Sequence, residues 1–232
     1  MRKIKTKIKY YILDFIVRKF SKDKLFARVL SKEENQAVRF VNHEFLNDIG
    51  WWNSWRTRNP QDKNGKPLPW VTYSYIFFIS NRLNKEFNVF EFGSGNSTLF
   101  FSDKVQQIDS VEHDQEWFNK MAVKLPDNAK IYFEKLVYGG NYSEVAIRSE
   151  KKYDLISIDG RDRVNCLINS FEALNESGVM VLDDSERIAY QKAIEFIMQK
   201  GFKRLDFWGI SPGLFYKKCT TIFYRELNVL GI

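Results

Sequence analysis

The sequence is poor in cysteine, glycine and proline, and it has no long apolar run. Two cysteines among 232 residues, Cys166 and Cys219, exclude a disulfide-bonded scaffold and a cysteine-based zinc cluster, and they fit a reducing compartment. Twelve glycines and five prolines exclude fibrous and linker-like classes. The N-terminal apolar run at residues 10–13 is too short for a membrane span or a signal peptide. Because 44% of the residues are hydrophobic, we expect a folded core and a cytoplasmic protein.

The positive charge is confined to one end of the chain. The net charge is +7, but residues 1–30 hold ten Lys and Arg against two Asp, which is +8, so residues 31–232 sum to −1. Ile4, Ile8, Tyr11, Ile12 and Phe15 recur at helical spacing within this basic segment. The pattern indicates an amphipathic helix. Such a helix either packs its apolar stripe on the main domain or lies peripherally on an anionic membrane surface.

Residues 1–69 form a basic helical extension in this interpretation, followed by an aromatic segment. Helical spacing continues over residues 31–48, and the stretch around Trp51–Trp55 is expected to be a loop that runs into a polar loop over residues 56–66. Aromatic residues upstream of a catalytic domain can form a lid over an acceptor. Ordinary packing is the alternative, and we favour it for Trp51 and Trp52.

Residues 70–232 are expected to form one α/β domain. Apolar strand-like runs alternate with helical patterns, beginning with a buried helix over residues 71–83 and including a helix over residues 185–199. The expected strands are residues 89–92, 107–112, 130–133, 153–159, 179–183, 204–208 and 220–225. The last two strands have no helix between them. We therefore expect a three-layer Rossmann-like sheet of seven mostly parallel strands with a C-terminal antiparallel hairpin.

A glycine-rich turn follows the first of these strands. In Glu91-Phe92-Gly93-Ser94-Gly95 the glycines permit a tight turn and close approach of a ligand to the backbone. Glu112 ends the next strand 21 residues after Glu91, where a carboxylate can accept the hydroxyls of a ribose. The third glycine of a dinucleotide-binding motif would fall at Thr98 and is absent. The carboxylate of Glu91 suits a cationic ligand end better than a pyrophosphate.

This pattern resembles the class I S-adenosylmethionine-dependent methyltransferases, over about residues 70–225. Their first motif is an acidic residue, any residue, Gly, any residue, Gly, and their second is an acidic residue that ends strand two. The resemblance implies that Glu91 contacts the methionine amino group, that Gly93 and Gly95 line the methionine part, and that Glu112 binds the ribose. The sequence departs from many members at Ser97, where they have a third glycine. The further cofactor contacts that we expect are Ser94, Ser97, Thr98, His113 and Asp159.

Three more carboxylates follow strands four and five, namely Asp159, Asp183 and Asp184. The carboxyl ends of neighbouring parallel strands converge on one crevice, where three negative charges need a cation or a proton. The pattern resembles cation-dependent O-methyltransferases, which implies that these three residues hold Mg²⁺. Two alternatives stay open. Salt bridges from the segment 161–163 neutralise the carboxylates, or Asp183 or Asp184 caps the helix near Ser185. Without a metal, Asp159 or Asp184 is the candidate general base.

The nature of the methyl acceptor follows partly from motifs that are missing. Amine-directed nucleic-acid methyltransferases carry Asn/Asp-Pro-Pro-aromatic after strand four, whereas this chain has Ile158-Asp159-Gly160-Arg161. Neither cysteine follows a proline, as the carbon-5 cytosine enzymes require. We expect an O-methyltransferase of a small molecule, such as a sugar or a lipid-linked glycan in polysaccharide biosynthesis. An RNA methyltransferase is the alternative, although residues 31–232 lack the positive charge of a nucleic-acid groove. A non-catalytic binding module that keeps the fold is the second alternative.

Overall fold

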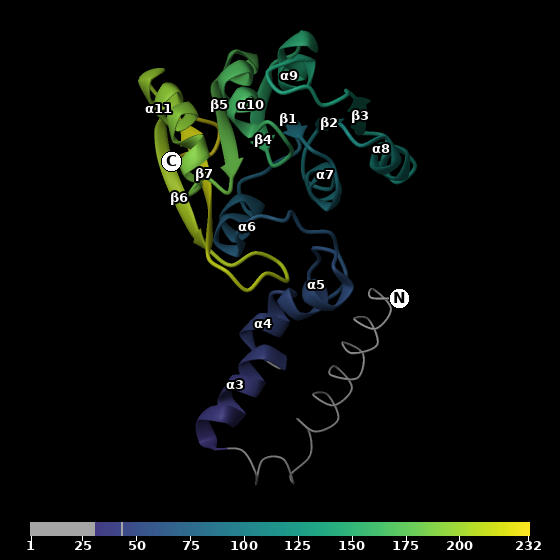
Figure 1. Ribbon diagram of the computed structural model, residues 1–232, viewed down its shortest axis with the longest axis vertical. Helices are drawn as coiled ribbons and strands as arrows, with labels where there is room; N and C mark the ends of the chain where they lie inside the picture. The colour runs from purple at the N-terminus through teal and green to yellow at the C-terminus, as the bar shows by residue number, and fades with distance from the viewer. Residues whose placement is uncertain (1–30, 43) are drawn as a thin grey trace. The chain divides into compact units, whose positions relative to one another are not determined.

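The computed structural model describes residues 31–42 and 44–232, which divide into two compact units (Figure 1). One unit holds the described residues up to Lys66 together with Pro212–Leu214, and the other holds Pro67–Ser211 and Phe215–Ile232. The amphipathic helix predicted in residues 1–30 lies outside the described residues. Within the described ranges, every helix is too short or too polar to cross a membrane.

The N-terminal unit contains three helices, α3 (Lys32–Asn42), α4 (Phe45–Asp48) and α5 (Trp51–Thr57). The loop predicted around Trp51–Trp55 is wrong, because these residues form α5. Asn and Ser are weak helix formers, but here tertiary packing overrides propensity. Trp51 and Trp52 are buried, and the Trp55 ring stacks on both. The Trp51 indole also donates a hydrogen bond to the Leu214 carbonyl at 2.8 Å. The burial agrees with the packing interpretation of these side chains.

The C-terminal unit is built on the predicted seven-stranded sheet. The strand order is β3-β2-β1-β4-β5-β7-β6, in which β7 runs antiparallel to both of its neighbours and the other pairs are parallel. The expected fold class, including the C-terminal hairpin, is confirmed. The strands are β1 (Asn88–Phe92), β2 (Gln107–Glu112), β3 (Ala129–Phe133), β4 (Tyr153–Ile158), β5 (Leu174–Asp183), β6 (Lys203–Gly209) and β7 (Lys218–Tyr224).

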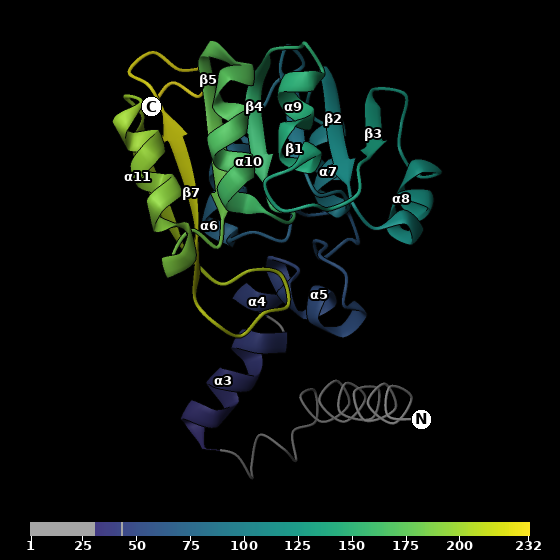
Figure 2. The ribbon, with the colours of Figure 1, turned by 45° about the horizontal axis from the view of Figure 1, so that its top comes forward.

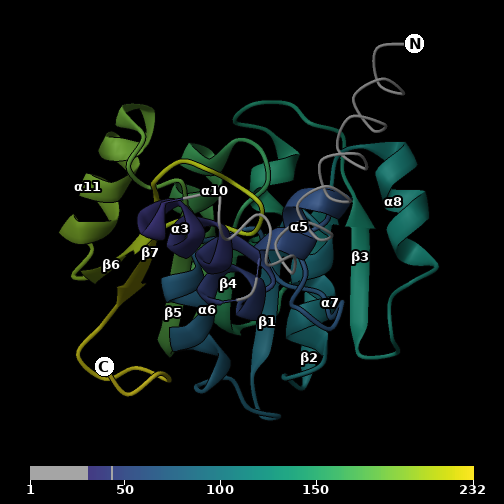
Figure 3. The same ribbon diagram turned by 90° about the horizontal axis from the view of Figure 1, so that it is seen from below.

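Helices cover both faces of this sheet, as Figures 2 and 3 show. Figure 2 shows α9, α10 and α11 over one face, and α6 and α7 lie over the other. Helix α8 packs against β2 and β3, at the β3 edge of the sheet. The helices of this unit are α6 (Tyr73–Ser80), α7 (Asn96–Ser102), α8 (Gln115–Ala122), α9 (Val145–Arg148), α10 (Arg163–Ser170) and α11 (Gln191–Gln199), with short 3-10 helices at Asn141–Glu144, Phe171–Ala173 and Ile188–Tyr190.

One expected helix boundary is wrong. The helix expected over residues 185–199 begins as α-helix only at Gln191, after the turn that follows β5 and a 3-10 segment. The side chain of Ser185 is buried and hydrogen-bonds to Thr221 on β7, which holds this segment against the sheet. Because no helix starts at Ser185, Asp183 and Asp184 do not cap one.

The strand order reverses next to β1, and this reversal locates the site. From β1 the chain moves outward to β2 and β3, and it then returns to the other side of β1 as β4. The helices that follow β1 and β4 lie on opposite faces, and in such sheets ligands bind outside the carboxyl ends of the two strands. The glycine-rich turn and Asp159 follow these two strands.

Candidate functional site

The turns after β1 and β4 pass each other at backbone contact distance. Gly93 has a φ of +93°, and a Cβ placed on it would lie 3.0 Å from the Cα of Gly160. A Cβ placed on Gly160 would lie 2.8 Å from the Gly93 nitrogen. Both positions therefore require glycine. The close crossing brings Asp159, the residue before Gly160, beside the glycine-rich turn.

The carboxylate of Glu91 is buried at the end of β1, with 1% of the residue exposed. Its Oε2 accepts a hydrogen bond from the Thr98 hydroxyl at 2.6 Å, and the same hydroxyl accepts from the Gly95 nitrogen. Its Oε1 has no hydrogen-bond partner among the described residues. Burial raises the pKa of Glu91 to about 7, although the hydroxyls of Ser97 and Thr98 lower it. The unpartnered oxygen is suited to a cationic ligand group.

Gly95 leaves open space above the turn. Its backbone is extended, and a Cβ placed on it would find one described neighbour within 4 Å, the Trp117 ring at 4.0 Å. That ring is fixed because its Nε1 donates to the Ser94 carbonyl at 2.8 Å. Asp114 caps α8 by accepting from the Trp117 nitrogen, which fixes the base of the same side chain. The indole therefore lies beside the open space at Gly95.

Glu112 ends β2 with a carboxylate held by the turn that follows. Its Oε1 accepts from the backbone nitrogens of His113 and Asp114 at 2.7 and 2.9 Å. Its Oε2 accepts from the Ser94 hydroxyl at 3.1 Å. The His113 ring lies edge-on to the ring of Tyr142, with centroids 5.9 Å apart. Ser94 thus joins the first turn to Glu112, and the two sequence motifs form one site.

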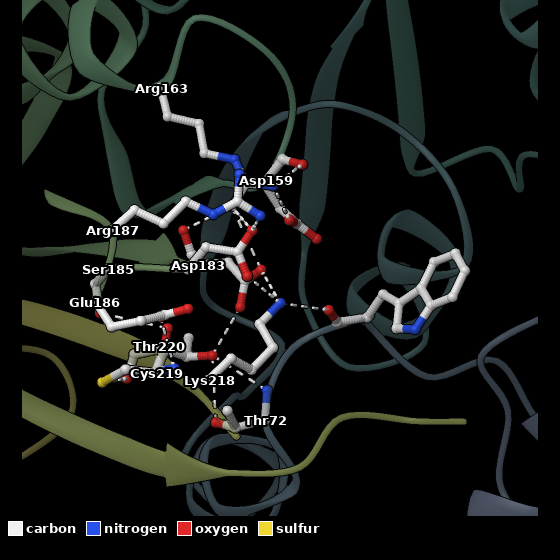
Figure 4. Close-up of polar contacts among 12 residues, drawn as sticks. Thr72, Asp159, Arg163, Asp183, Ser185, Glu186, Arg187, Lys218, Cys219 and Thr220 are labelled. Atoms are coloured by element: carbon white, nitrogen blue, oxygen red, sulfur yellow. Dashed lines mark hydrogen bonds and ion pairs between the residues drawn. The ribbon is translucent and has the colours of Figure 1, made fainter. Parts of the chain in front are cut away.

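Asp159, Asp183 and Asp184 come together as predicted, but they surround cations of the chain itself. Figure 4 shows Asp159 and Asp183 beside Arg163 and Lys218. The Arg163 guanidinium lies 2.9 Å from Asp159 and 3.2 Å from Asp184, and it also donates to the Asp183 carbonyl at 2.6 Å. The Lys218 ammonium lies 2.5 Å from Asp183 and 2.6 Å from Asp184. Every member of this ion-pair cluster belongs to the C-terminal unit.

The three carboxylates differ in how strongly they are paired. Among the described residues Asp159 contacts one cation, Asp183 two and Asp184 three, the third being Arg187. Burial works against the charge of Asp184, but its cations outweigh burial and lower its pKa. Burial and the charge of Asp183 raise the pKa of Asp159 well above its usual value, against the opposing effect of Arg163. The side chain of Asp159 is 21% exposed, against 2% and 6% for the other two.

Solved structures of other proteins resemble this chain in fold. The rRNA methylase from Streptococcus thermophilus superposes with a TM-score of 0.50 at 12% identity, over 65% of this chain and 93% of that one. The chain has the class I methyltransferase fold. A putative caffeoyl-CoA O-methyltransferase from Staphylococcus aureus matches with a TM-score of 0.49 at 15% identity, over 84% and 100% of the two chains. A putative methyltransferase from Streptococcus mutans, in complex with SAH, matches at 0.48 and 12%, over 64% and 94%. No family model and no curated protein matches the chain.

The residues around the glycine-rich turn and Glu112 fit S-adenosylmethionine, the cofactor that the methyltransferase fold implies. The unpartnered Oε1 of Glu91 offers a buried carboxylate to an amino group, and the space above Gly95 would be filled by a side chain at that position. Ser94 and Glu112 lie together at the end of β2, where the ribose hydroxyls would bind. Thr98 is fully buried and engaged with Glu91 and Gly95, so it supports the site from beneath.

The ion-pair cluster around Asp159, Asp183 and Asp184 does not fit the predicted Mg²⁺. The described residues contain no group of acidic, His or Cys side chains arranged to hold a metal ion. The ammonium of Lys218 lies between two of the predicted ligands, and Arg163 contacts all three. The alternative in which salt bridges from the segment 161–163 neutralise the carboxylates is therefore correct for Arg163. The carboxylate of Asp162 instead accepts hydrogen bonds from Gly139 and Asn165.

Lys218, Gly160 and Tyr142 are site residues that the sequence did not single out. Lys218 is the first residue of β7, and it is 4% exposed. A lysine that begins an otherwise uncharged buried strand is the signal that could have identified it, because a buried ammonium needs anionic partners.

Proposed function

We propose that this chain transfers a methyl group from S-adenosylmethionine to an oxygen atom of a small molecule, with Asp159 as the general base. The observation that carries the proposal is the difference between Asp159 and its two acidic neighbours. Asp159 has one cation partner among the described residues, a raised pKa and the most exposed side chain of the three. A carboxylate with a pKa nearer neutrality accepts a proton from a hydroxyl more readily than a carboxylate that is paired with several cations does.

The protein's contribution to this reaction is placement and proton acceptance. Bound S-adenosylmethionine supplies a methyl group on a sulfonium, which is already activated for in-line attack. Glu91, Ser94 and Glu112 would hold the two ends of the cofactor, while the crossing of Gly93 and Gly160 keeps that turn beside Asp159. Holding the acceptor hydroxyl in line is worth several orders of magnitude in rate. Asp159 would accept the proton of the acceptor hydroxyl when the methyl group passes from the sulfur to that oxygen, leaving S-adenosylhomocysteine.

Cysteine chemistry is a poor alternative for this chain. Cys166 and Cys219 are both fully buried. Burial raises the pKa of each thiol, so neither is present as the thiolate that a nucleophile requires. A sugar or a lipid-linked glycan remains our proposal for the acceptor, because hydroxyls are the groups that a carboxylate base activates and aromatic side chains stack on sugar rings.

The experiment is a methyl-transfer screen with labelled cofactor over sugars, phenols and RNA. We expect transfer to hydroxyl compounds and none to RNA. The Asp159→Asn variant should bind S-adenosylmethionine as the parent does but lose about 100-fold or more in turnover, the usual contribution of a general base. Asp103→Asn, at an exposed site after α7, is the matched control and should keep full activity. Transfer to RNA alone, or full turnover in Asp159→Asn, would refute the proposal.

A further inference from the structure

Lys218 lies beside the end of β5 because of the strand register. The antiparallel pairing of β5 and β7 sets Asp183 opposite Thr220, whose hydroxyl donates to Asp183 Oδ1 at 2.9 Å. Lys218 lies two residues earlier on β7, so its side chain points to the same face as that of Thr220. The position carries the ammonium past the end of β5, to the place where the chain turns at Asp184.

The ammonium is held charged although it is buried. Burial lowers the pKa of Lys218, but the charges of Asp183 and Asp159 and the hydrogen bonds to Asp183 and Asp184 raise it overall. A buried ammonium without such partners would shed its proton. Lys218 is therefore a permanent cation within the ion-pair cluster.

The carboxylate oxygens that face this cation are already used. Oδ2 of Asp183 and Oδ1 of Asp184 bind Lys218, while Oδ2 of Asp184 binds Arg163 and Arg187. Mg²⁺ needs oxygen ligands at about 2.0–2.1 Å in near-octahedral geometry, which oxygens engaged by ammonium and guanidinium groups do not offer. Arg163 and Lys218 together supply the two positive charges that one divalent cation would bring.

The backbone of Asp184 gives a second indication. Its φ is +56°, in the left-handed region that residues other than glycine rarely adopt. The three ion pairs of its carboxylate compensate for this conformation. The turn after β5 is thus built around cations of the chain.

We propose that the Lys218 ammonium takes the place of a divalent cation at the carboxylates that follow β4 and β5, so that the acceptor site works without a metal. Lys218 is a positioning residue here, because it acts through Asp183 and Asp184. The role of the acceptor site rests on the proposed function, but the identity of its cation can be tested by binding alone. When the ammonium is removed, Oδ2 of Asp183 and Oδ1 of Asp184 lose their shared cation, and a divalent cation should then bind there.

The test compares Mg²⁺ and Mn²⁺ binding to the full chain and its variants by calorimetry and thermal denaturation. Lys218→Met removes the charge and keeps the length, and Lys218→Ala adds room for an ion. Lys217→Met, at the exposed neighbour whose ammonium lies over the Trp208 ring, is the control with the same change in net charge. At a cation concentration of about ten times the dissociation constant, the midpoint temperature of thermal denaturation of each Lys218 variant should rise by about 3–6 °C. The parent and Lys217→Met should show no saturable binding.

Each remaining outcome overturns the proposal. Saturable Mg²⁺ or Mn²⁺ binding to the parent would show that the carboxylates accept a metal beside Lys218. Variants that do not respond, or that stay unfolded even with the cation present, would show that Lys218 does not stand in for one. S-adenosylmethionine binding to the same samples is measured separately. Its absence would refute the proposed function and leave the cation result standing.

Discussion

Gly93 and Gly160 lie so close that a Cβ placed on either would meet the backbone of the other, at 3.0 Å and 2.8 Å. The crossing holds the turn after β1 against the turn after β4, and in this way it fixes the proposed cofactor-binding turn beside Asp159. Tyr142 closes the contact from the other side, because its hydroxyl would lie 2.3 Å from a Cβ on Gly160. Two strand ends and a buried tyrosine therefore define one rigid corner.

Gly160→Ala should damage the fold at this corner. Two of the three nearest atoms to the new methyl group are backbone atoms, which cannot rotate away. We expect a loss of about 3 kcal/mol or more in the free energy of unfolding, the upper range for overpacking, measured by urea denaturation.

Gly95→Ala is the matched control for that variant. Its extended backbone accepts alanine, and the new methyl group would meet only the Trp117 ring among the described residues. The variant should fold as the parent does, but S-adenosylmethionine should bind at least tenfold more weakly because the methyl group fills the ligand space. Normal stability in Gly160→Ala, or normal affinity in Gly95→Ala, would contradict this division of roles.

The sequence predicts the local parts of the site better than the distant ones. Glu91, Thr98 and Gly95 lie within eight residues, and the hydrogen bonds that join them follow from a strand that turns into a helix. The partnership of Lys218 with Asp183 spans 35 residues and depends on the register of β5 against β7. Periodicity identifies both strands but does not set that register. The convergence of the three aspartates was therefore predicted, but their contacts with Lys218 were missed.

Helix α5 shows the same limit at the level of secondary structure. Its tryptophans stabilise the helix by stacking and burial in the folded unit, which no local propensity records. The boundary near Ser185 was wrong for a similar reason, since the hydrogen bond to Thr221 comes from a strand that is distant in sequence.

Glu91→Gln should stabilise the unliganded protein and weaken the cofactor complex. The folded pKa of about 7 lies above the unfolded value, so the folded state binds the proton more tightly. The stability of the parent should therefore fall as the pH rises from about 4.5 to about 7, and it should stay constant above that. Gln removes this dependence and should add up to about 3 kcal/mol at pH 8, measured by denaturation across pH.

The cofactor affinity supplies the opposing measurement for Glu91. S-adenosylmethionine should bind the parent more tightly as the pH rises from 6 to 8, because the ionised carboxylate pairs with the amino group. Glu91→Gln should bind at least tenfold more weakly at pH 8 and should lack that trend. An unchanged affinity in the variant would place the amino group elsewhere.

The acid limb of the pH profile, where kcat falls as the pH is lowered, should follow the pKa of Asp159. The base must be ionised, and burial together with the charge of Asp183 raises its pKa, so turnover should fall at a pH well above the ordinary aspartate value. Asp183→Asn removes one of the groups that raise this pKa, and the acid limb should then move to lower pH. The measurement is kcat against pH at saturating cofactor. A limb that stays in place would assign the titration to another group.

The basic segment at residues 1–30 should affect membrane binding and not the cofactor site. Its ten Lys and Arg and two Asp sum to +8, and each basic residue near an anionic lipid surface contributes about 1 kcal/mol. Deletion of residues 1–30 should reduce co-sedimentation with anionic vesicles at low salt, where screening is weak, and leave the affinity for S-adenosylmethionine unchanged. Neutral vesicles are the control, and neither form should co-sediment with them. If the two forms bind anionic vesicles equally, the segment's role is to pack its apolar stripe on the protein.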